Sequence, residues 1–121
     1  MPVKCLIVDD NVLFRQGATD LLNREGLDVV GAAADSREAI RLAQELRPDV
    51  TLVDVDLGVE DGFELARQLT ELPGQSSKVI LVSTHPEEDL AYLIATSPAL
   101  GFIPKARLSA YTICELLQRA A

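Results

Sequence analysis

The sequence predicts an α/β fold in which a doubly wound parallel sheet of five strands is covered by five helices. Short apolar runs rich in β-branched residues alternate with helical patterns along the whole chain. Buried strands of a parallel sheet have this composition, and right-handed crossovers between such strands place helices on both faces of the sheet. We therefore expect residues 1–121 to form one α/β domain.

The five strands are expected at the apolar runs of the chain, and the helices at apolar residues that recur every three or four positions. The first helix should be capped by Gly26, the second should open at Asp35 and end at Pro48, and the fourth should begin near Glu87 and close at Ser97-Pro98. The expected strands are 5–8, 28–33, 50–54, 79–82 and 100–103. The helix residues expected to face the core are Leu13, Gly17, Leu21 and Leu22, then Ala39, Leu42, Ala43 and Leu46, then Leu65, Ala66 and Leu69, then Leu90, Leu93 and Ile94, and finally Ile113, Leu116, Leu117 and Ala120.

The composition limits the possible partners. No apolar run approaches the roughly 20 residues that span a bilayer, and the N-terminus lacks a signal-peptide pattern, so we expect a cytoplasmic protein without membrane contact. A net charge of -8 argues against direct nucleic-acid binding, because duplex affinity depends on Lys and Arg that neutralise phosphates. Cys5 and Cys114 fit an apolar strand and an apolar helix side, and both are predicted to be buried thiols.

Reactive side chains stand at the carboxyl ends of the predicted strands. Asp9-Asp10 follows the first strand, Asp54 ends the third, Ser83-Thr84 follows the fourth, and Lys105 comes one proline after the fifth. Ligands of open α/β sheets bind at these strand ends, so we expect the residues to converge. Carboxylates, a hydroxyl and an ammonium group together suit a phosphoryl group and a hard divalent cation such as Mg²⁺ or Mn²⁺.

In this order and at these strand ends, the motifs resemble those of the response-regulator receiver domain, the phospho-accepting part of two-component signalling. The resemblance implies a flavodoxin-like topology with strand order 2-1-3-4-5. It also implies that a sensor histidine kinase or a phosphotransfer protein donates a phosphoryl group to Asp54 in a Mg²⁺-dependent reaction. The matching motifs are Val8-Asp9-Asp10, Leu52-Val53-Asp54, Asp61-Gly62, Ser83, and Gly101-Phe102 with Lys105.

The resemblance assigns a role to each charged residue of the predicted site. Asp54 would be the nucleophile and become an aspartyl phosphate. Asp10, and Asp9 through a water molecule, would hold the metal together with Asp54 and the backbone carbonyl of Asp56. Lys105 would pair with the carboxylate or with the phosphoryl oxygens. Such groups neutralise the charge that gathers on a transferring phosphoryl group.

A switch is expected to connect this site to the surface of the fourth helix, fifth strand and fifth helix. Ser83 would donate a hydrogen bond to the bound phosphoryl group. The resemblance makes Phe102 a rotamer switch, although its position in an apolar strand is equally typical of a core residue. The altered surface would then meet a second copy or an output domain of a longer regulator. The residues expected on it are Tyr92, Arg107, Tyr111 and Glu115.

Four positions depart from the usual receiver pattern. Gly58 replaces a proline, which predicts a looser loop, and Asp56 adds a carboxylate that should repel anionic donors and slow phosphorylation. Thr84 replaces a very small residue. Ala106 stands where a proline commonly follows the lysine, which puts the cis peptide expected there in doubt. Three further polar residues near the site are expected to be exposed to solvent: Glu60, Asp61 and His85.

Three other functions share parts of this pattern. Val53-Asp54-Val55-Asp56 has the form of the nucleophile motif of haloacid-dehalogenase-like phosphatases, but the acidic pair expected late in that family comes first here. The second alternative is a receiver-shaped interaction module that is never phosphorylated. Such a module would be expected to lack Asp54, Asp10 or Lys105, and this chain has all three. A flavodoxin-like cofactor site is disfavoured because Asp9-Asp10-Asn11 would repel the FMN phosphate.

Overall fold

The structure is a computed structural model and describes residues 2–74 and 77–120. Its main sheet consists of β1 (Lys4–Val8), β2 (Asp28–Ala33), β3 (Val50–Asp54), β6 (Lys78–Ser83) and β7 (Gly101–Pro104). The helices are α1 (Val12–Arg24), α2 (Ser36–Leu46), α3 (Gly62–Thr70), α4 (Ala91–Thr96) and α5 (Ala110–Arg119), with 3-10 turns at Glu87–Leu90 and Lys105–Arg107. The strands are parallel and lie in the order β2-β1-β3-β6-β7, which confirms the predicted fold class and strand order.

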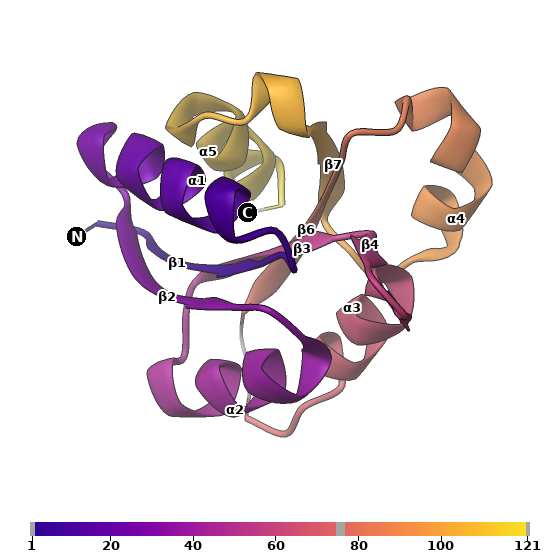
Figure 1. The fold of residues 1–121 in the computed structure, drawn as a ribbon, viewed down its shortest axis with the longest axis horizontal. Coiled ribbons are helices and arrows are strands. Elements are labelled where there is room, and N and C mark those ends of the chain that lie inside the picture. The colour runs from indigo at the N-terminus through magenta and orange to yellow at the C-terminus, as the bar shows by residue number, and fades with distance from the viewer. Residues whose placement is uncertain (1, 75–76, 121) are drawn as a thin grey trace.

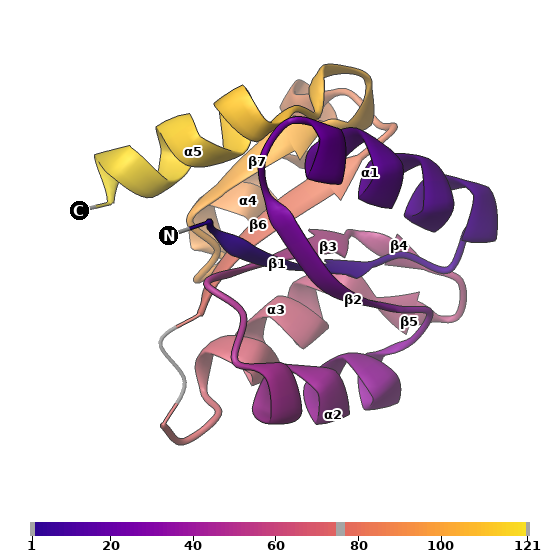
Figure 2. The same cartoon turned by 90° about the vertical axis from the view of Figure 1, so that its left-hand side faces the viewer.

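Helices α1 and α5 cover one face of the sheet, and α2 and α3 cover the other (Figures 1 and 2). A hydrophobic layer lies between the sheet and the helices on each face. Cys5 and Ile7 of β1 face the layer below α1 and α5, whereas Leu6 and Val8 face the layer below α2, α3 and α4. The same alternation continues through the neighbouring strands, because successive side chains of a strand point to opposite faces. Burial on both faces explains why the strands read as continuous apolar runs.

The inner side of α1 differs from the prediction. Ala18 and Leu22 are buried and Phe14 packs beside them, so the buried stripe follows four-residue spacing from Phe14. Leu13 is 75% exposed, and Gly17 is also exposed. Each lies one residue before a member of that stripe. Successive side chains of an α-helix point about 100° apart, so these two positions face away from the sheet.

The fourth helix is shorter than predicted. Glu87–Leu90 forms a 3-10 turn, and the α-helix begins only at Ala91. Leu90 and Ile94 pack on the core as expected, but Leu93 is exposed. Ala120, which was also expected to face the core, is exposed because α5 ends at Arg119.

A small antiparallel hairpin between β3 and α3 was not predicted. It consists of β4 (Asp56–Leu57) and β5 (Glu60–Asp61), joined at Gly58 and Val59. Gly58 has a φ of 71°, in the left-handed region that suits tight hairpin turns. The segment therefore has a defined backbone where the sequence indicated only a polar loop.

The prediction that both cysteines are buried is correct for Cys5 but only in part for Cys114. Cys5 is fully buried, and burial raises the pKa of its thiol to about 12. Cys114 is only half-buried at the edge of the same layer. The composition of Leu72-Pro73-Gly74-Gln75-Ser76-Ser77 predicts a loop, and residues 75 and 76 within it lie outside the described residues.

No helix within the described parts of the chain combines the length and the apolar character required to cross a bilayer.

Two glycines should respond oppositely to substitution by alanine. A Cβ on Gly62 would overlap the carbonyl oxygen of Asp54 and lie 2.6 Å from the Cα of Val55, so Gly62→Ala should lower the free energy of unfolding by about 1–3 kcal/mol. Gly17 lies inside α1, where a Cβ meets nothing within 4 Å, so Gly17→Ala should raise it by about 0.5–1 kcal/mol. Urea unfolding of both variants measures the two changes. Equal effects of the same sign would contradict the packing at Gly62.

Candidate functional site

The carboxylates predicted from the strand ends lie together. Asp9 and Asp10 follow β1 and Asp54 ends β3, and each offers an oxygen that lies within 4.8 Å of the other two. Asp9 and Asp54 are buried, whereas Asp10 is exposed. The N-cap of α1 is Asn11, whose side chain accepts the N–H of Phe14, so Asp10 is not used as a cap.

Lys105 supplies the positive charge of this site. Its Nζ lies 2.6 Å from Oδ2 of Asp9 and 3.1 Å from Oδ2 of Asp54, and its side chain is only 15% exposed. Burial by itself would lower the pKa of Lys105, but the contacts with Asp9 and Asp54 outweigh it and raise the pKa above its usual value. The ammonium is therefore charged at neutral pH. It also lies 4.3 Å from the ring centroid of Phe14, a cation–π distance.

The two carboxylate oxygens of Asp9 differ in their surroundings. Oδ1 accepts a backbone hydrogen bond, and Oδ2 is buried without one. Its Oδ1 accepts the N–H of Asn11 at 2.9 Å, and its carbonyl oxygen accepts a hydrogen bond from Arg15 at 2.7 Å. Its Oδ2 is buried, and the Lys105 ammonium lies beside it as an ion pair. A buried oxygen of this kind fits a cation site.

The carboxyl of Asp54 has a raised pKa. Burial raises the pKa of its carboxyl from 3.8 to about 6, and the Asp9 charge acts in the same direction, against hydrogen bonds from the N–H of Asp56 and from Lys105. The three carboxylates thus lie together, and the Lys105 ammonium contacts two of them, Asp9 and Asp54. Because these are hard oxygen ligands with excess negative charge, Asp9, Asp10 and Asp54 fit a divalent cation such as Mg²⁺ or Mn²⁺.

The predicted switch residues lie on the neighbouring strands. Asp54 pairs with Val82 in the sheet, and Ser83 is the next residue of β6. Ser83 is buried, and its Oγ accepts the N–H of His85 at 2.9 Å, which leaves the hydroxyl proton available for another acceptor. Phe102 of β7 is half-buried against the layer below α2, α3 and α4. Thr84 is exposed.

Asp56 contributes to the site through its backbone as well as its side chain. Its N–H donates to Oδ1 of Asp54 at 3.1 Å. Its exposed carboxylate has Oδ2 at 3.5 Å from Nε2 of His85, which is also exposed. No peptide bond within the described residues is cis, so the bond between Lys105 and Ala106 is trans.

Sequence reasoning missed several residues that support the site. Arg15 and Phe14 could have been found from their place in the first turn of the helix after Asp10. Glu60, predicted to be solvated, is half-buried and accepts hydrogen bonds from the N–H of Ser36 at 2.9 Å and from its Oγ at 2.5 Å. Asp61 is exposed as expected, and it caps α3 by accepting the N–H of Phe63.

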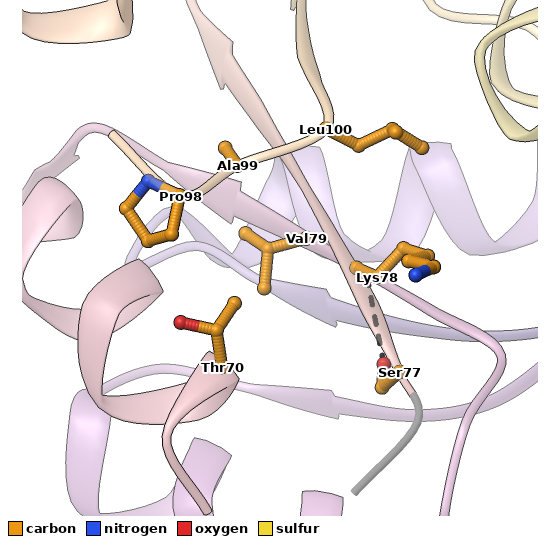
Figure 3. A pocket seen from close by; sticks show the side chains of 7 residues that line it. All are labelled: Thr70, Ser77, Lys78, Val79, Pro98, Ala99 and Leu100. Atoms are coloured by element: carbon orange, nitrogen blue, oxygen red, sulfur yellow. Dashed lines mark hydrogen bonds between the residues drawn. The ribbon is translucent and has the colours of Figure 1, made fainter. Parts of the chain in front are cut away.

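A cavity of about 410 Å³ lies away from these residues, at the opposite edge of the sheet. It adjoins the start of β6 and the segment that leads into β7, and its lining contains no carboxylate (Figure 3). The lining residues are Thr70, Ser77, Lys78, Val79, Pro98, Ala99 and Leu100. The carboxylate cluster is therefore a surface site at the strand ends rather than part of this cavity.

Comparison with known proteins supplies the family. The response regulator receiver domain matches residues 5–117. The chain is 33% identical over 121 residues to the response regulator protein VraR of Staphylococcus saprophyticus, which covers 98% of this chain and 56% of VraR. The signal receiver domain of the response regulator NarL from Mycobacterium tuberculosis superposes with a TM-score of 0.83 and 29% identity, over 98% of this chain and 96% of that one. A response regulator from Burkholderia pseudomallei, solved with a phosphorylated aspartic acid, a calcium ion and citrate, gives a TM-score of 0.81 and 25% identity, over 96% of this chain and 66% of its own.

The chain belongs to the response regulator receiver domain family. This confirms the resemblance inferred from the strand-end motifs and makes the chain a signalling domain of two-component systems. It spans about half the length of the response and transcription regulators it matches. It spans less than a third of the protein-glutamate methylesterases it also matches.

The pKa of Asp54 predicts how stability depends on pH without metal. Between the ordinary pKa of 3.8 and the folded value of about 6, the folded state binds more protons than the unfolded state, so the free energy of unfolding falls as pH rises through this window. Asp54→Asn removes this penalty. It should raise the free energy of unfolding at pH 7 by an amount on the order of 2 kcal/mol, and the difference should shrink below pH 4.

Urea unfolding in EDTA at a series of pH values measures this difference. Glu45→Gln, which changes an exposed carboxylate of α2, is the control and should leave the profile unchanged. If Asp54→Asn followed the wild-type pH profile, the raised pKa would be refuted.

Proposed function

We propose that residues 1–121 act as one receiver domain that accepts a phosphoryl group on Asp54 from a sensor histidine kinase or a phosphotransfer protein, in a Mg²⁺-dependent reaction. The observation that carries this proposal is the position of Lys105, whose Nζ contacts both Asp9 and Asp54 within the carboxylate cluster. Family membership supports it. The Burkholderia pseudomallei response regulator, solved with a phosphorylated aspartic acid and a calcium ion, also supports it.

The chemistry assigned to the chain is a phosphoryl transfer between a donor and Asp54. A carboxylate oxygen of Asp54 attacks the phosphorus, a new P–O bond forms, and the bond from phosphorus to the donor nitrogen or acyl oxygen breaks, with its electron pair leaving on the donor. Lys105 balances the charge on the phosphoryl oxygens, and the N–H of Asp56 holds the Asp54 carboxylate in place. Asp9, Asp10, Asp54 and the backbone carbonyl of Asp56 would hold Mg²⁺ or Mn²⁺, which supplies further charge neutralisation. The domain would thus catalyse only its own phosphorylation and dephosphorylation.

The proposed output surface consists of α4, β7 and α5. Tyr92 and Tyr111 are 78% and 74% exposed on it. Phe102 lines a surface cavity of about 350 Å³ together with Arg107 and Glu115 of the same face. A movement of Phe102 would therefore reshape this cavity, which supports its role as a switch toward a second copy or an output domain. A cytoplasmic location belongs to the same proposal.

Phosphorylation of Asp54 is tested by intact mass spectrometry after incubation with acetyl phosphate and Mg²⁺. The wild-type chain should gain one phosphate, and both Asp54→Asn and chelation with EDTA should abolish the gain, because the nucleophile or the charge-neutralising cation is then missing. Asp20→Asn, at an exposed position of α1, should label normally.

Other outcomes of that experiment identify other functions. Unchanged labelling of Asp54→Asn would refute the assignment of the acceptor. Absence of labelling even with a cognate kinase would favour an interaction module regulated without phosphorylation. Repeated release of phosphate from an added phosphomonoester would favour a haloacid-dehalogenase-like phosphatase. The slowing expected from Asp56 stays a prediction, and the exposed position of its carboxylate beside His85 agrees with a role at the entrance of the site.

The switch is tested with the phosphoryl mimic beryllofluoride and amide chemical shifts. Addition of the mimic should move signals of the α4, β7 and α5 face as well as those around Asp54, because the new negative charge attracts the Ser83 hydroxyl. Ser83→Ala should leave the shifts around Asp54 and remove the distant ones, whereas Thr84→Ala, at the exposed neighbour, should keep both. Distant shifts that persist in Ser83→Ala would exclude Ser83 as the link.

A further inference from the structure

The β4–β5 hairpin is a weak structure that touches the site at two points. It has two residues in each strand, and a two-stranded hairpin of this size is marginal by itself. Its turn contains Gly58 and the fully exposed Val59, so no side chain packs at the tip. The hairpin nevertheless lies beside two carboxylates. The N–H of Asp56 donates to Asp54, and a Cβ added to Gly58 would lie 3.3 Å from Oδ2 of Asp10.

Different anchors hold the two strands of the hairpin. Leu57 of β4 is buried in the layer below α2 and α3. Glu60, which pairs with Leu57 across the hairpin, has its carboxylate on the N–H and the Oγ of Ser36. Hydrogen bonds to an ionised acceptor are stronger than neutral ones, and a carboxylate is further favoured at the N-terminal turn of a helix.

The partner of Glu60 is itself rigidly placed. Ser36 is the first residue of α2, and its neighbour Asp35 caps the helix by accepting the N–H of Glu38. Ala39 and Ala43 bury the same helix against the sheet. The contact between Glu60 and Ser36 therefore joins the hairpin to a fixed part of the fold.

We propose that Glu60 is a positioning residue of the metal site, which acts through Ser36 to hold the hairpin and with it the backbone of Asp56. This inference rests on the proposed function, in which the carbonyl of Asp56 is a metal ligand. The hydrogen bonds to the Glu60 carboxylate come from Ser36 and not from the groups proposed to react. Loss of Glu60 should therefore weaken metal binding while leaving Asp54 and Lys105 able to react once the metal is bound.

The experiment separates binding from chemistry. Calorimetric titration of the unphosphorylated protein should show a Mg²⁺ dissociation constant about 10-fold higher in Glu60→Ala than in wild type, as for other residues that orient metal ligands. At saturating Mg²⁺, labelling by acetyl phosphate should return to within about two-fold of the wild-type rate. Glu45→Ala removes one negative charge from the exposed far end of α2 and should leave the dissociation constant unchanged.

Further variants test the contact itself. Ser36→Ala removes one of the two hydrogen bonds and should weaken Mg²⁺ binding less than Glu60→Ala. The double variant should bind no more weakly than Glu60→Ala alone, because both changes break the same contact. Glu60→Gln keeps an acceptor oxygen and should recover part of the affinity. Ser36→Ala and Glu60→Gln also carry the test if Glu60→Ala does not fold.

The inference is overturned by an unchanged dissociation constant in these variants, by an equal loss in Glu45→Ala, or by a slow labelling rate that saturating Mg²⁺ does not restore. Failure of the proposed function is distinguishable, because the wild-type protein would then neither bind Mg²⁺ nor accept phosphate, and the inference would fall with it.

Discussion

Repulsion among Asp9, Asp10 and Asp54, balanced only in part by Lys105, is the constraint on which the rest of the site depends. The sheet brings the three carboxylates within 4.8 Å of one another, and the ammonium bridges just two of them. Burial raises the pKa of Asp54, and the negative charge of Asp9 adds to this effect. The supporting contacts of Arg15, Asn11 and the Asp56 backbone all serve to keep this unfavourable group of charges in one geometry.

The sequence predicted those parts of the structure that follow from periodicity. Asp9, Asp54, Ser83 and Lys105 could be placed because each ends or follows an apolar run, and parallel strands bring their carboxyl ends to one edge. The strand order was available only through the family resemblance. A similar local argument failed for Leu13, because two overlapping helical stripes in α1 differ by one residue and only packing decides between them.

The parts that the sequence did not predict depend on contacts between distant residues. Glu60 and Ser36 are 24 positions apart, and neither lies in a pattern that points to the other. The hairpin at Asp56–Asp61 is likewise set by its burial at Leu57 and by the close approach of Gly62 to Asp54, not by strand propensity. Such features arise when the chain is folded, so composition and spacing do not contain them.

Cys5 lies in the central part of the sheet with a thiol whose pKa is about 12. The thiolate is the form that reacts with oxidants and alkylating reagents, and at neutral pH almost none of it is present while the protein is folded. The chain thus keeps this thiol unreactive on β1, beside the strand β3 that ends at Asp54. The rate at which a thiol reagent modifies Cys5 therefore reports how often the sheet around it opens.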